Sequence, residues 1–385
     1  MKNRVNTQVA NLHLSGIRTF SEEASKVDGV ISLTIGEPEF ATDDSVKQAA
    51  IEALNDNFTH YPPASGILPL RRSIIAFEKK LHGLDYAENE IIVTNGSTQG
   101  LSATFLALLN PGDEVIIPAP MYVSYAPMLE YCEAVLVELD TTDNEFQINE
   151  DKLRSLISAK TKMIVITSPN NPTGCVYDQA SIDAVIRASK EFDLFVVSDD
   201  VYNQLVYMDH LPSVCDDPSM KDRLIITQSL SKPYSMTGWR VGYVLGDRPI
   251  IAEITKMHQY LVAGISSFSQ RAAIKALDVD VQPMVDNYRR RRDRCYAVLQ
   301  EIGLKCVEPQ GAFYLFPDIA EFGMDSVTFC RKALYEYKVA FVPGIYFSEV
   351  ADHFFRISYA AKEENLYEGM NRLKQMILDL RAEKK

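Results

Sequence analysis

The 385-residue sequence is poor in the residue patterns that hold metals or form disulfides. Its six cysteines are scattered, with no two of them separated by two residues, and its six histidines form no H-E-x-x-H pattern or close pair. Zinc sites and disulfide-rich folds need closely spaced ligands or a framework of paired cysteines. We therefore expect no metal site, and free thiols that suit a reducing compartment.

Long apolar runs and an excess of positive charge are also absent. No stretch reaches the roughly 18 consecutive apolar residues of a membrane helix, and residues 1–16 lack the apolar region and cleavage site of a signal peptide. The formal net charge of −13 disfavours nucleic acid as the main partner. One basic run exists, the arginines at 289–292 and 294, and its helical context favours a solvated face or a subunit contact. These features predict a soluble, cytoplasmic protein.

What the sequence does contain is a regular alternation of short apolar runs and amphipathic stretches. The apolar runs are typical of buried strands and lie at 90–94, 113–119, 134–139, 163–169, 194–200 and 224–230. Apolar residues at helical spacing separate them, as in Ile182, Val185 and Ile186. This order predicts an α/β fold with a largely parallel sheet covered by helices on both faces.

The pattern changes beyond about residue 278. A long charged helix is followed by strand candidates at 306–309, 312–317, 339–344 and 354–360, with helices between and after them. This arrangement is typical of a smaller α+β domain. We expect a large domain over residues 41–278 and a small domain built from residues 1–40 and 279–385.

Residues 95–100 follow the first predicted strand and open a helix. The glycines in this loop permit close backbone approach, and Ser97 and Thr98 lie at the positive end of the helix dipole. A phosphate-binding loop and an ordinary helix cap both explain this pattern.

Polar side chains also follow three later strands. Asn171 comes after the strand at 163–169, Asp199 lies at the end of the next one, and Lys232 comes shortly after Ser229 at the end of the third. Ligands of open parallel sheets bind outside the carboxyl ends of the strands. The sequence therefore predicts that an amide, an acid and an amine meet at one edge of the sheet.

Lys232 offers the most specific chemistry of these residues. A lysine that is partly desolvated beside cations loses proton affinity and becomes a nucleophile toward carbonyl groups. Pyridoxal phosphate uses such a lysine, and it also needs an acid at its ring nitrogen and a cradle for its phosphate. Asp199 is the candidate acid, with a helix cap or an arginine ion pair as its alternative role. The cradle candidates are Ser97, Thr98, Ser229 and Arg240.

The same residues belong to a series of motifs that covers most of the chain. In order, the series is GEPEF at 36–40, Tyr61 with Gly66, LR at 70–71, the loop at 95–100, PMYVSY at 120–125, NPTG at 171–174, SDDVY at 198–202, SK and TGWR within 231–240, GAFY at 311–314, VPG at 342–344 and RIS at 356–358. It resembles the class I aminotransferases of pyridoxal-phosphate fold type I, in the branch with aspartate, aromatic and N-acetyl-diaminopimelate aminotransferases. The resemblance implies an enzyme that moves an amino group between an L-amino acid and a 2-oxo acid.

The resemblance also implies how the cofactor would be held. Lys232 would bind pyridoxal 5'-phosphate covalently and move protons, Asp199 would pair with the ring nitrogen, Asn171 and Tyr202 would hydrogen-bond the phenolic oxygen, and Tyr122 would stack on the ring. The phosphate would lie on Ser97, Thr98, Ser229 and Arg240, with Tyr61 arriving from the neighbouring subunit of a homodimer.

For the substrate, the resemblance assigns the α-carboxylate to Arg356, helped by Gly36 and Asn171, because an arginine fork binds a carboxylate through two hydrogen bonds. A surface ion pair is the alternative role of Arg356. Ile17 and Arg18 are candidates for reading the far end of the substrate, although Arg18 equally suits a solvated cap. Glutamate with 2-oxoglutarate is one expected pair, and an aromatic amino acid or N-acetyl-L,L-diaminopimelate the other amino donor.

Two other functions share parts of this pattern. A carbon–sulfur β-lyase would use the same lysine, acid and arginine, and would release pyruvate and ammonia from a cysteine conjugate without transfer to 2-oxoglutarate. A non-catalytic cofactor-binding regulator would carry a basic helix-turn-helix domain, and no such region precedes the motifs that begin at residue 36.

Overall fold

The computed structural model describes residues 4–12, 14–83 and 85–384. The α-helices in these ranges are α1 (Thr7–Asn11), α2 (Gly16–Ala24), α3 (Asp44–Asn55), α4 (Leu68–His82), α5 (Gly96–Leu108), α6 (Tyr125–Tyr131), α7 (Glu150–Leu156), α8 (Gln179–Glu191), α9 (Arg248–Val262), α10 (Ser267–Ala276), α11 (Gln282–Glu301), α12 (Ser326–Tyr337) and α13 (Glu363–Glu383). Several begin after a side chain that accepts a first-turn amide, such as Asp43, Asp178 and Ser266. These caps satisfy amides that have no partner inside the helix.

The strands are β1 (Ile31–Ser32), β2 (Ile91–Thr94), β3 (Glu114–Ala119), β4 (Val135–Asp140), β5 (Thr161–Thr167), β6 (Phe195–Asp199), β7 (Leu224–Ser229), β8 (Gly242–Leu245), β9 (Tyr314–Leu315), β10 (Val339–Ala340), β11 (Val342–Pro343) and β12 (Phe355–Ser358). A 7-stranded sheet has the order β2-β8-β7-β6-β5-β3-β4. Only β8 runs antiparallel to its neighbours in this sheet. The predicted, largely parallel α/β sheet is confirmed, with β8 as a strand that the apolar pattern did not predict.

Both faces of the large sheet are buried. Ile91 and Val93 of β2 belong to a core that includes residues of α4, α8 and α10, while Ile92 belongs to a second core with residues of α5, α6 and α9. Successive strand residues point to opposite faces, so a strand covered on both sides must be apolar throughout. This explains the continuous apolar runs in the sequence.

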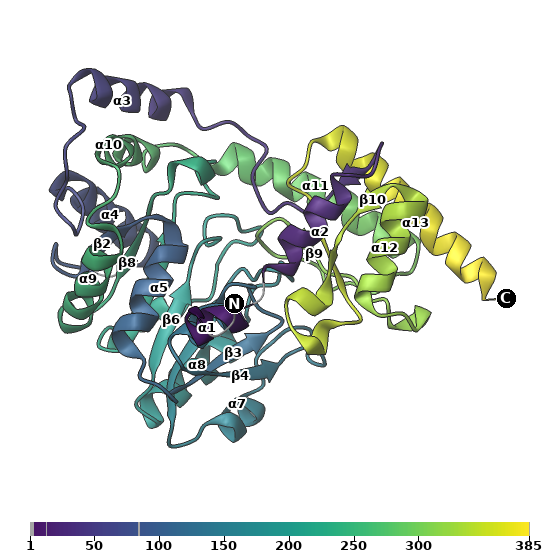
Figure 1. Cartoon of the computed structure of the whole chain (residues 1–385), viewed down its shortest axis with the longest axis horizontal. Coiled ribbons are helices and arrows are strands. Elements are labelled where there is room, and N and C mark those ends of the chain that lie inside the picture. The colour runs from purple at the N-terminus through teal and green to yellow at the C-terminus, as the bar shows by residue number, and fades with distance from the viewer. Residues whose placement is uncertain (1–3, 13, 84, 385) are drawn as a thin grey trace.

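A second body of structure gathers near the C-terminus. Figure 1 shows α11, α12 and α13 together with β9 and β10 on one side of the molecule and the large sheet on the other. Here a 3-stranded sheet has the order β11-β12-β9, and β1 from the N-terminal segment pairs in parallel with β10. Phe313, Phe329 and Phe355 are fully buried in the core of this body.

The strand prediction at 306–309 is wrong. These residues form no strand. The backbone that follows them is hydrogen-bonded to a loop, since the amides of Gln310 and Gly311 donate to the Gly174 carbonyl. Val307 packs against an aromatic cluster that contains Phe316 and Phe354. The apolar side chains are thus explained by packing against a loop rather than by a sheet.

The arginine run of α11 is partly internal, because Arg291 and Arg292 are buried while Arg290 and Arg294 are exposed. The side chains of Arg291 and Arg292 are 3% and 9% exposed, respectively. Arg291 pairs with Glu39, and Arg292 lies 3.0 Å from Glu308. The expectation of a solvated face is therefore wrong for these two residues, because carboxylates within the same chain offset the cost of burying their charges.

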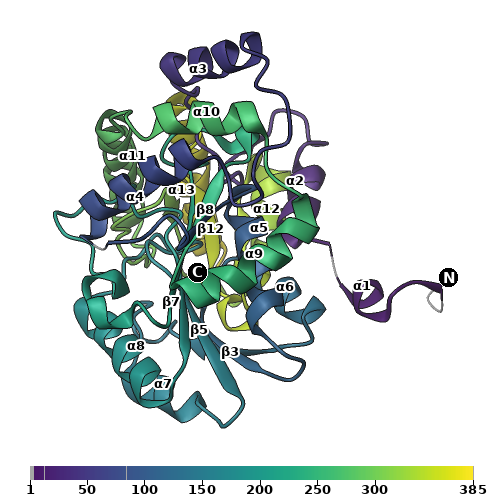
Figure 2. The ribbon, with the colours of Figure 1, turned by 90° about the vertical axis from the view of Figure 1, so that its left-hand side faces the viewer.

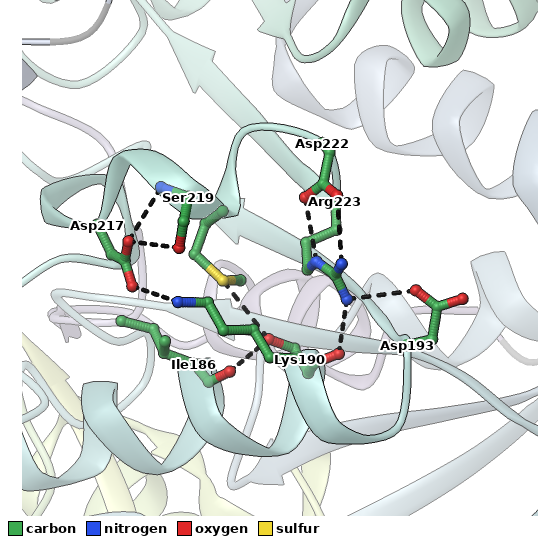
Figure 3. A network of polar contacts seen from close by, with 9 residues as sticks. Ile186, Lys190, Asp193, Asp217, Ser219, Asp222 and Arg223 are labelled. Atoms are coloured by element: carbon green, nitrogen blue, oxygen red, sulfur yellow. Dashed lines mark hydrogen bonds and ion pairs between the residues drawn. The ribbon is translucent and has the colours of Figure 1, made fainter.

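Exposed charges gather at the amino ends of β6 and β7 (Figure 3). Lys190 Nζ lies 2.6 Å from Asp217 Oδ2, and Arg223 Nη1 donates to the Ser189 carbonyl at 3.0 Å and to Asp193 at 3.3 Å. Exposed pairs of this kind contribute about 0–1 kcal/mol each. They tie the end of α8 to the start of β7 and lie at the sheet edge opposite to the predicted site.

Helix α1 stands out from the rest of the chain (Figure 2), and exposed apolar side chains lie on it and beside it, namely Val9 in the helix and Val5 and Leu14 near its ends. Among the described residues, no helix is both long and apolar enough to cross a bilayer. The six cysteines are all free. Within the same part of the chain, no three potential metal ligands cluster.

Candidate active site

A cavity of about 670 Å³ opens at the carboxyl ends of β5, β6 and β7. The predicted site residues in its wall are Ile17, Arg18, Gly36, Ser97, Thr98, Tyr122, Asn171, Asp199, Tyr202, Ser229, Lys232, Arg240 and Arg356. Tyr61 is the exception, because it is 92% exposed and does not line this cavity. The fold thus gathers residues from across the sequence into one wall, as the strand-end argument predicts.

Lys232 follows β7 and reaches into the cavity from a short turn. Its Nζ donates a hydrogen bond to the Gly36 carbonyl at 2.5 Å. Burial lowers the pKa of Lys232 to about 8, with Glu37 opposing this shift and Arg356 and Arg240 adding to it. An amine with this pKa is partly unprotonated near neutral pH, so it can attack a carbonyl group.

Asp199 ends β6 and is buried. The Tyr125 hydroxyl donates to Asp199 Oδ2 at 2.6 Å and lies 2.5 Å from Thr167 Oγ1. Burial raises the pKa of Asp199 to about 6, opposed by the Tyr125 hydroxyl and the Val201 backbone. Oδ1 is buried and accepts no hydrogen bond of standard geometry from the described residues. Such an atom is costly without a donor, and a cationic ring N–H would satisfy it.

Helix α5 presents its N-terminus to the cavity through Ser97 and Thr98, without a side-chain cap or an acidic residue in the first turn. Gly96 begins this helix with a φ of +73°, and a Cβ there would lie 2.5 Å from Arg240 Nη2. Only glycine therefore lets the guanidinium approach the helix end. Amides, hydroxyls and a cation at a helix N-terminus fit a phosphate.

Ser229 completes this side of the cavity. It ends β7, and its hydroxyl lies 2.8 Å from Ser231 Oγ and 3.1 Å from the Ser231 amide. The turn between β7 and β8 then brings Arg240 back beside it, with Arg240 in the left-handed region at a φ of 57°. The serine hydroxyls and the guanidinium thus belong to one turn.

Arg356 lies in β12 and is 3% exposed, so the alternative of a surface ion pair is wrong. Its Nη1 donates to Asn171 Oδ1 at 2.8 Å and its Nη2 to the Thr34 carbonyl at 2.7 Å. The guanidinium carbon lies 4.4 Å from the centre of the Tyr314 ring, and burial lowers the pKa of Arg356. Nε is buried without a partner, and none of the ion pairs among the described residues involves this arginine. A buried cation is costly without a balancing anion, so the site fits a carboxylate ligand.

Tyrosines form another part of the wall. The hydroxyls of Tyr202 and Tyr314 lie 2.8 Å apart, and both residues are buried. Tyr122 packs edge-on against Tyr125, with the ring centres 5.5 Å apart. A Cβ on Gly36 would lie 2.2 Å from the Tyr314 hydroxyl, so this glycine permits the close approach of the N-terminal segment.

Four residues of the site, Tyr125, Tyr314, Glu37 and Thr237, were not predicted from the sequence. Tyr314, Glu37 and Thr237 line the cavity, and the Thr237 hydroxyl donates to Glu37 across two distant segments. Tyr125 does not line the cavity but donates a hydrogen bond to Asp199. All four residues lie within the motifs noted above, and that membership was the available signal. Motif membership alone does not reveal which side chain meets which.

The chain is similar to known proteins over nearly its whole length. The profile of the family "Aminotransferase class I and II" matches residues 28–373. A probable N-acetyl-LL-diaminopimelate aminotransferase of Bacillus subtilis (strain 168) is 38% identical, covering 99% of this chain and 98% of its own. An aspartate aminotransferase of Pyrococcus horikoshii is 38% identical over 94% of each chain.

Solved structures agree. The crystal structure of aspartate aminotransferase from Thermotoga maritima superposes with a TM-score of 0.93 at 34% identity, covering 97% of this chain and 100% of that one. The aromatic aminotransferase from Pyrococcus horikoshii OT3 gives a TM-score of 0.89 at 38% identity, covering 94% and 99%.

The fold, the cavity and these similarities define an enzyme that transfers an amino group between an amino acid and a 2-oxo acid. The chain belongs to the class I and II aminotransferase family, in the branch that contains aspartate, aromatic and N-acetyl-LL-diaminopimelate aminotransferases. Enzymes of this family use pyridoxal phosphate.

Proposed function

We propose that this enzyme works with pyridoxal 5'-phosphate carried covalently by Lys232. The observation that carries the proposal is the pairing, in one cavity, of an amine of lowered pKa with a buried acid whose Oδ1 lacks a partner. When bound, the cofactor supplies an electron-withdrawing ring that makes the substrate Cα–H acidic. Asp199 would pair with the ring nitrogen and favour its cationic form. Lys232 would hold the cofactor covalently, and its amine, when free, would take up and return the proton at the substrate Cα.

The phosphate is assigned to the N-terminus of α5. Ser97 and Thr98 provide donors in the first helical turn, and Ser229 and Arg240 close the opposite side. The helix dipole and the guanidinium both favour an anion here. This cradle holds the cofactor while Lys232 is free during turnover.

The substrate α-carboxylate is assigned to Arg356. Asn171 and the Thr34 carbonyl orient its guanidinium, and Nε is buried without a partner in a residue that lines the cavity. The backbone of Gly36 lies beside Lys232 and completes this end of the site. Fixing the carboxylate sets the direction of the Cα–H bond, so the proton is held within reach of the Lys232 amine.

Two tyrosines and Asn171 complete the cofactor site in this proposal. Tyr122 stacks on the ring, and Tyr202 and Asn171 hydrogen-bond its phenolic oxygen. Tyr202 is oriented by its 2.8 Å contact with Tyr314, which supports a fixed hydroxyl at this place. Tyr202 thereby tunes the reactivity of the carbon that Lys232 holds.

We assign glutamate and 2-oxoglutarate as one substrate pair, and an aromatic amino acid or N-acetyl-L,L-diaminopimelate as the other amino donor. The names of two relatives support the two choices of amino donor. Ile17 and Arg18 line the cavity from α2 and are assigned to the far end of the substrate. A cation at this position favours substrates whose far end carries a carboxylate.

We also propose a cytoplasmic homodimer in which Tyr61 reaches the phosphate of the partner subunit. The exposed Tyr61 ring and the apolar residues around α1 support such an interface. Residues 41–278 form the large domain, and residues 1–40 and 279–385 form the small domain. The pairing of β1 with β10 supports this assignment of the N-terminal segment.

The test is a screen of amino donors and 2-oxo acids. The spectral change of the bound cofactor reports whether each compound reacts. Lys232→Ala is expected to retain some cofactor through the phosphate cradle and to lose turnover by many orders of magnitude. Turnover like that of the wild type in this variant contradicts the proposal. Pyruvate and ammonia from a cysteine conjugate, without transfer to 2-oxoglutarate, identify a carbon–sulfur lyase instead, and a protein that stays colourless with added cofactor identifies a regulator.

A further inference from the structure

Residues 33–42, which we call the strap, line the cavity through Ile35, Gly36 and Glu37 and contact both bodies of structure. On the side of the large sheet, the Gly36 carbonyl accepts a hydrogen bond from Lys232, and Glu37 accepts one from Thr237. Further along, the Thr42 hydroxyl donates to the Ser235 carbonyl at 2.6 Å. The strap is therefore tied to the turn that carries the reactive lysine.

The same segment is tied to the C-terminal body. The Leu33 amide donates to the Ala340 carbonyl at 2.9 Å, and the Ser358 amide donates to the Leu33 carbonyl at 2.9 Å. The Thr34 carbonyl accepts the 2.7 Å hydrogen bond of Arg356. One short stretch of backbone thus contacts both the amine and the guanidinium of the site.

Arg291 of α11 contacts the strap through Glu39. Its side chain, 3% exposed, reaches from α11 to the Glu39 carboxylate, which is 19% exposed. Nη1 donates to the Ala361 carbonyl at 2.7 Å, and the guanidinium carbon lies 5.4 Å from the centre of the Phe40 ring. Two successive strap residues, Glu39 and Phe40, therefore rest on one buried cation.

We propose that Arg291 is a positioning residue for the reaction, which acts through Glu39 to hold the strap against Lys232 and Arg356. The inference rests on the proposed roles of these two site residues. Arg291 does not line the cavity, so it has no contact with a ligand there. Its loss would leave Glu39 without its buried partner and release Gly36 and Thr34 from their places, while the elements that carry Lys232 and Arg356 stay intact.

Arg292 provides a matched control. It is the next residue of the same helix, is similarly buried, and donates to the Pro309 carbonyl and to Glu308 rather than to the strap. Arg291→Met and Arg292→Met should therefore lower the Tm by similar amounts. Only the first should disturb the site.

The first measurement needs no turnover. Amide hydrogen exchange of the peptide that covers residues 33–42, in the purified protein without added cofactor, should become faster in Arg291→Met and stay unchanged in Arg292→Met. Exchange like that of the wild type in Arg291→Met overturns the proposal, and so does equal acceleration in both variants.

The second measurement is steady-state kinetics with the cofactor present. Arg291→Met should raise KM for both substrates by about tenfold or more, because small misplacements of a binding group are costly, with a smaller change in kcat and no loss of the lysine-linked cofactor absorbance. Arg291→Lys should recover part of this loss, and Arg292→Met should show wild-type KM values. Wild-type KM in Arg291→Met, or an equal rise in Arg292→Met, contradicts the positioning role.

A double-mutant cycle tests whether Arg291 acts through Glu39. Glu39→Gln alone should raise KM, and it should add little in the Arg291→Met background, since the two groups act as a pair. Additive effects of the two changes overturn the route through Glu39. A wild-type protein that forms no lysine-linked absorbance contradicts the proposed function instead, and the exchange measurement then still decides whether Arg291 holds the strap.

Discussion

The Tyr125 hydroxyl holds Oδ2 of Asp199 at 2.6 Å, and the other carboxylate oxygen is left buried without a partner. The two oxygens of the Asp199 carboxylate therefore have different environments. One oxygen accepts a hydrogen bond from the protein, while Oδ1 is buried without a donor in a residue that lines the cavity. Burial raises the pKa of Asp199, and the hydroxyl of Tyr125 lowers it in part.

Removing this hydroxyl should shift the pH dependence of cofactor binding. The pKa of Asp199 is already raised to about 6 by burial, and the Tyr125 hydroxyl lowers it. In Tyr125→Phe the pKa of Asp199 should rise further. As the pH is lowered, binding of pyridoxal 5'-phosphate should therefore begin to weaken at a higher pH in the variant than in the wild type. Titration of cofactor absorbance between pH 5 and 8 measures this shift. Tyr177→Phe, which removes a buried hydroxyl away from the cavity, should leave the profile unchanged; an unchanged profile in Tyr125→Phe contradicts the account.

The rate of covalent capture of the cofactor should follow the ionisation of Lys232. Its pKa is lowered to about 8, so below pH 8 the rate constant should fall about tenfold per pH unit and above it should level off. Glu37 raises this pKa, so Glu37→Gln should move the profile to lower pH. Stopped-flow absorbance at several pH values measures both. A profile that still rises steeply above pH 9, or one that moves upward in the variant, would falsify the assignment.

Gly96→Ala should weaken cofactor binding more than it weakens the fold. The new Cβ would lie 2.5 Å from Arg240 Nη2, and the loss of a charge-assisted contact corresponds to about a 10- to 100-fold rise in Kd. Gly29→Ala is the control, because Gly29 has nearly the same φ, +72° against +73°, and open space around its Cβ position. Both variants should lose similar stability, measured by Tm, and only Gly96→Ala should lose cofactor affinity. Equal affinities in the two variants argue against the phosphate cradle.

Arg356→Lys should reduce kcat/KM by about 100-fold, because an ammonium does not reproduce a two-pronged contact with a carboxylate. The guanidinium of Arg356 donates through Nη1 to Asn171 and through Nη2 to the Thr34 carbonyl. A lysine side chain has a single nitrogen, so it also loses the orientation that these two hydrogen bonds give to the arginine. The matched measurement uses an amine that lacks the α-carboxylate. Wild type and variant should react with it at the same slow rate, and a large difference for this amine would show that the arginine acts in another way.

Glu78 should make the protein less stable as pH rises. Burial raises its pKa from 4.5 to about 7, while Tyr243 donates a 2.6 Å hydrogen bond to Oε1. The folded state thus holds a proton that the unfolded state releases above pH 4.5, so this contribution, up to about 3 kcal/mol, is full below pH 4.5 and is lost as pH rises through 7. Glu78→Gln has no proton that titrates in this range, so its Tm should vary less between pH 5 and 8. Parallel Tm curves for the two proteins would rule this out.

Local patterns in the chain were sufficient for most of the architecture. Residues 91–93 and 224–226 are apolar at every position because both sheet faces are covered there. The alternation of such strands with helices predicts a parallel sheet. Because parallel strands end at one edge, Asn171, Asp199 and Lys232 were predicted to meet, and they do line one cavity. The part that Tyr61 plays in a partner subunit stays a prediction.

Packing between distant segments decided the rest. Residues 306–309 carry apolar side chains for a loop contact, and Arg291 is buried because Glu39, far away in the chain, meets it. In the same way, the pKa of Asp199 depends on a hydroxyl that arrives from α6. Periodicity shows which side chains are buried, whereas the partner of a buried charge, and with it the chemistry of that charge, is set only when the folded chain brings the two together.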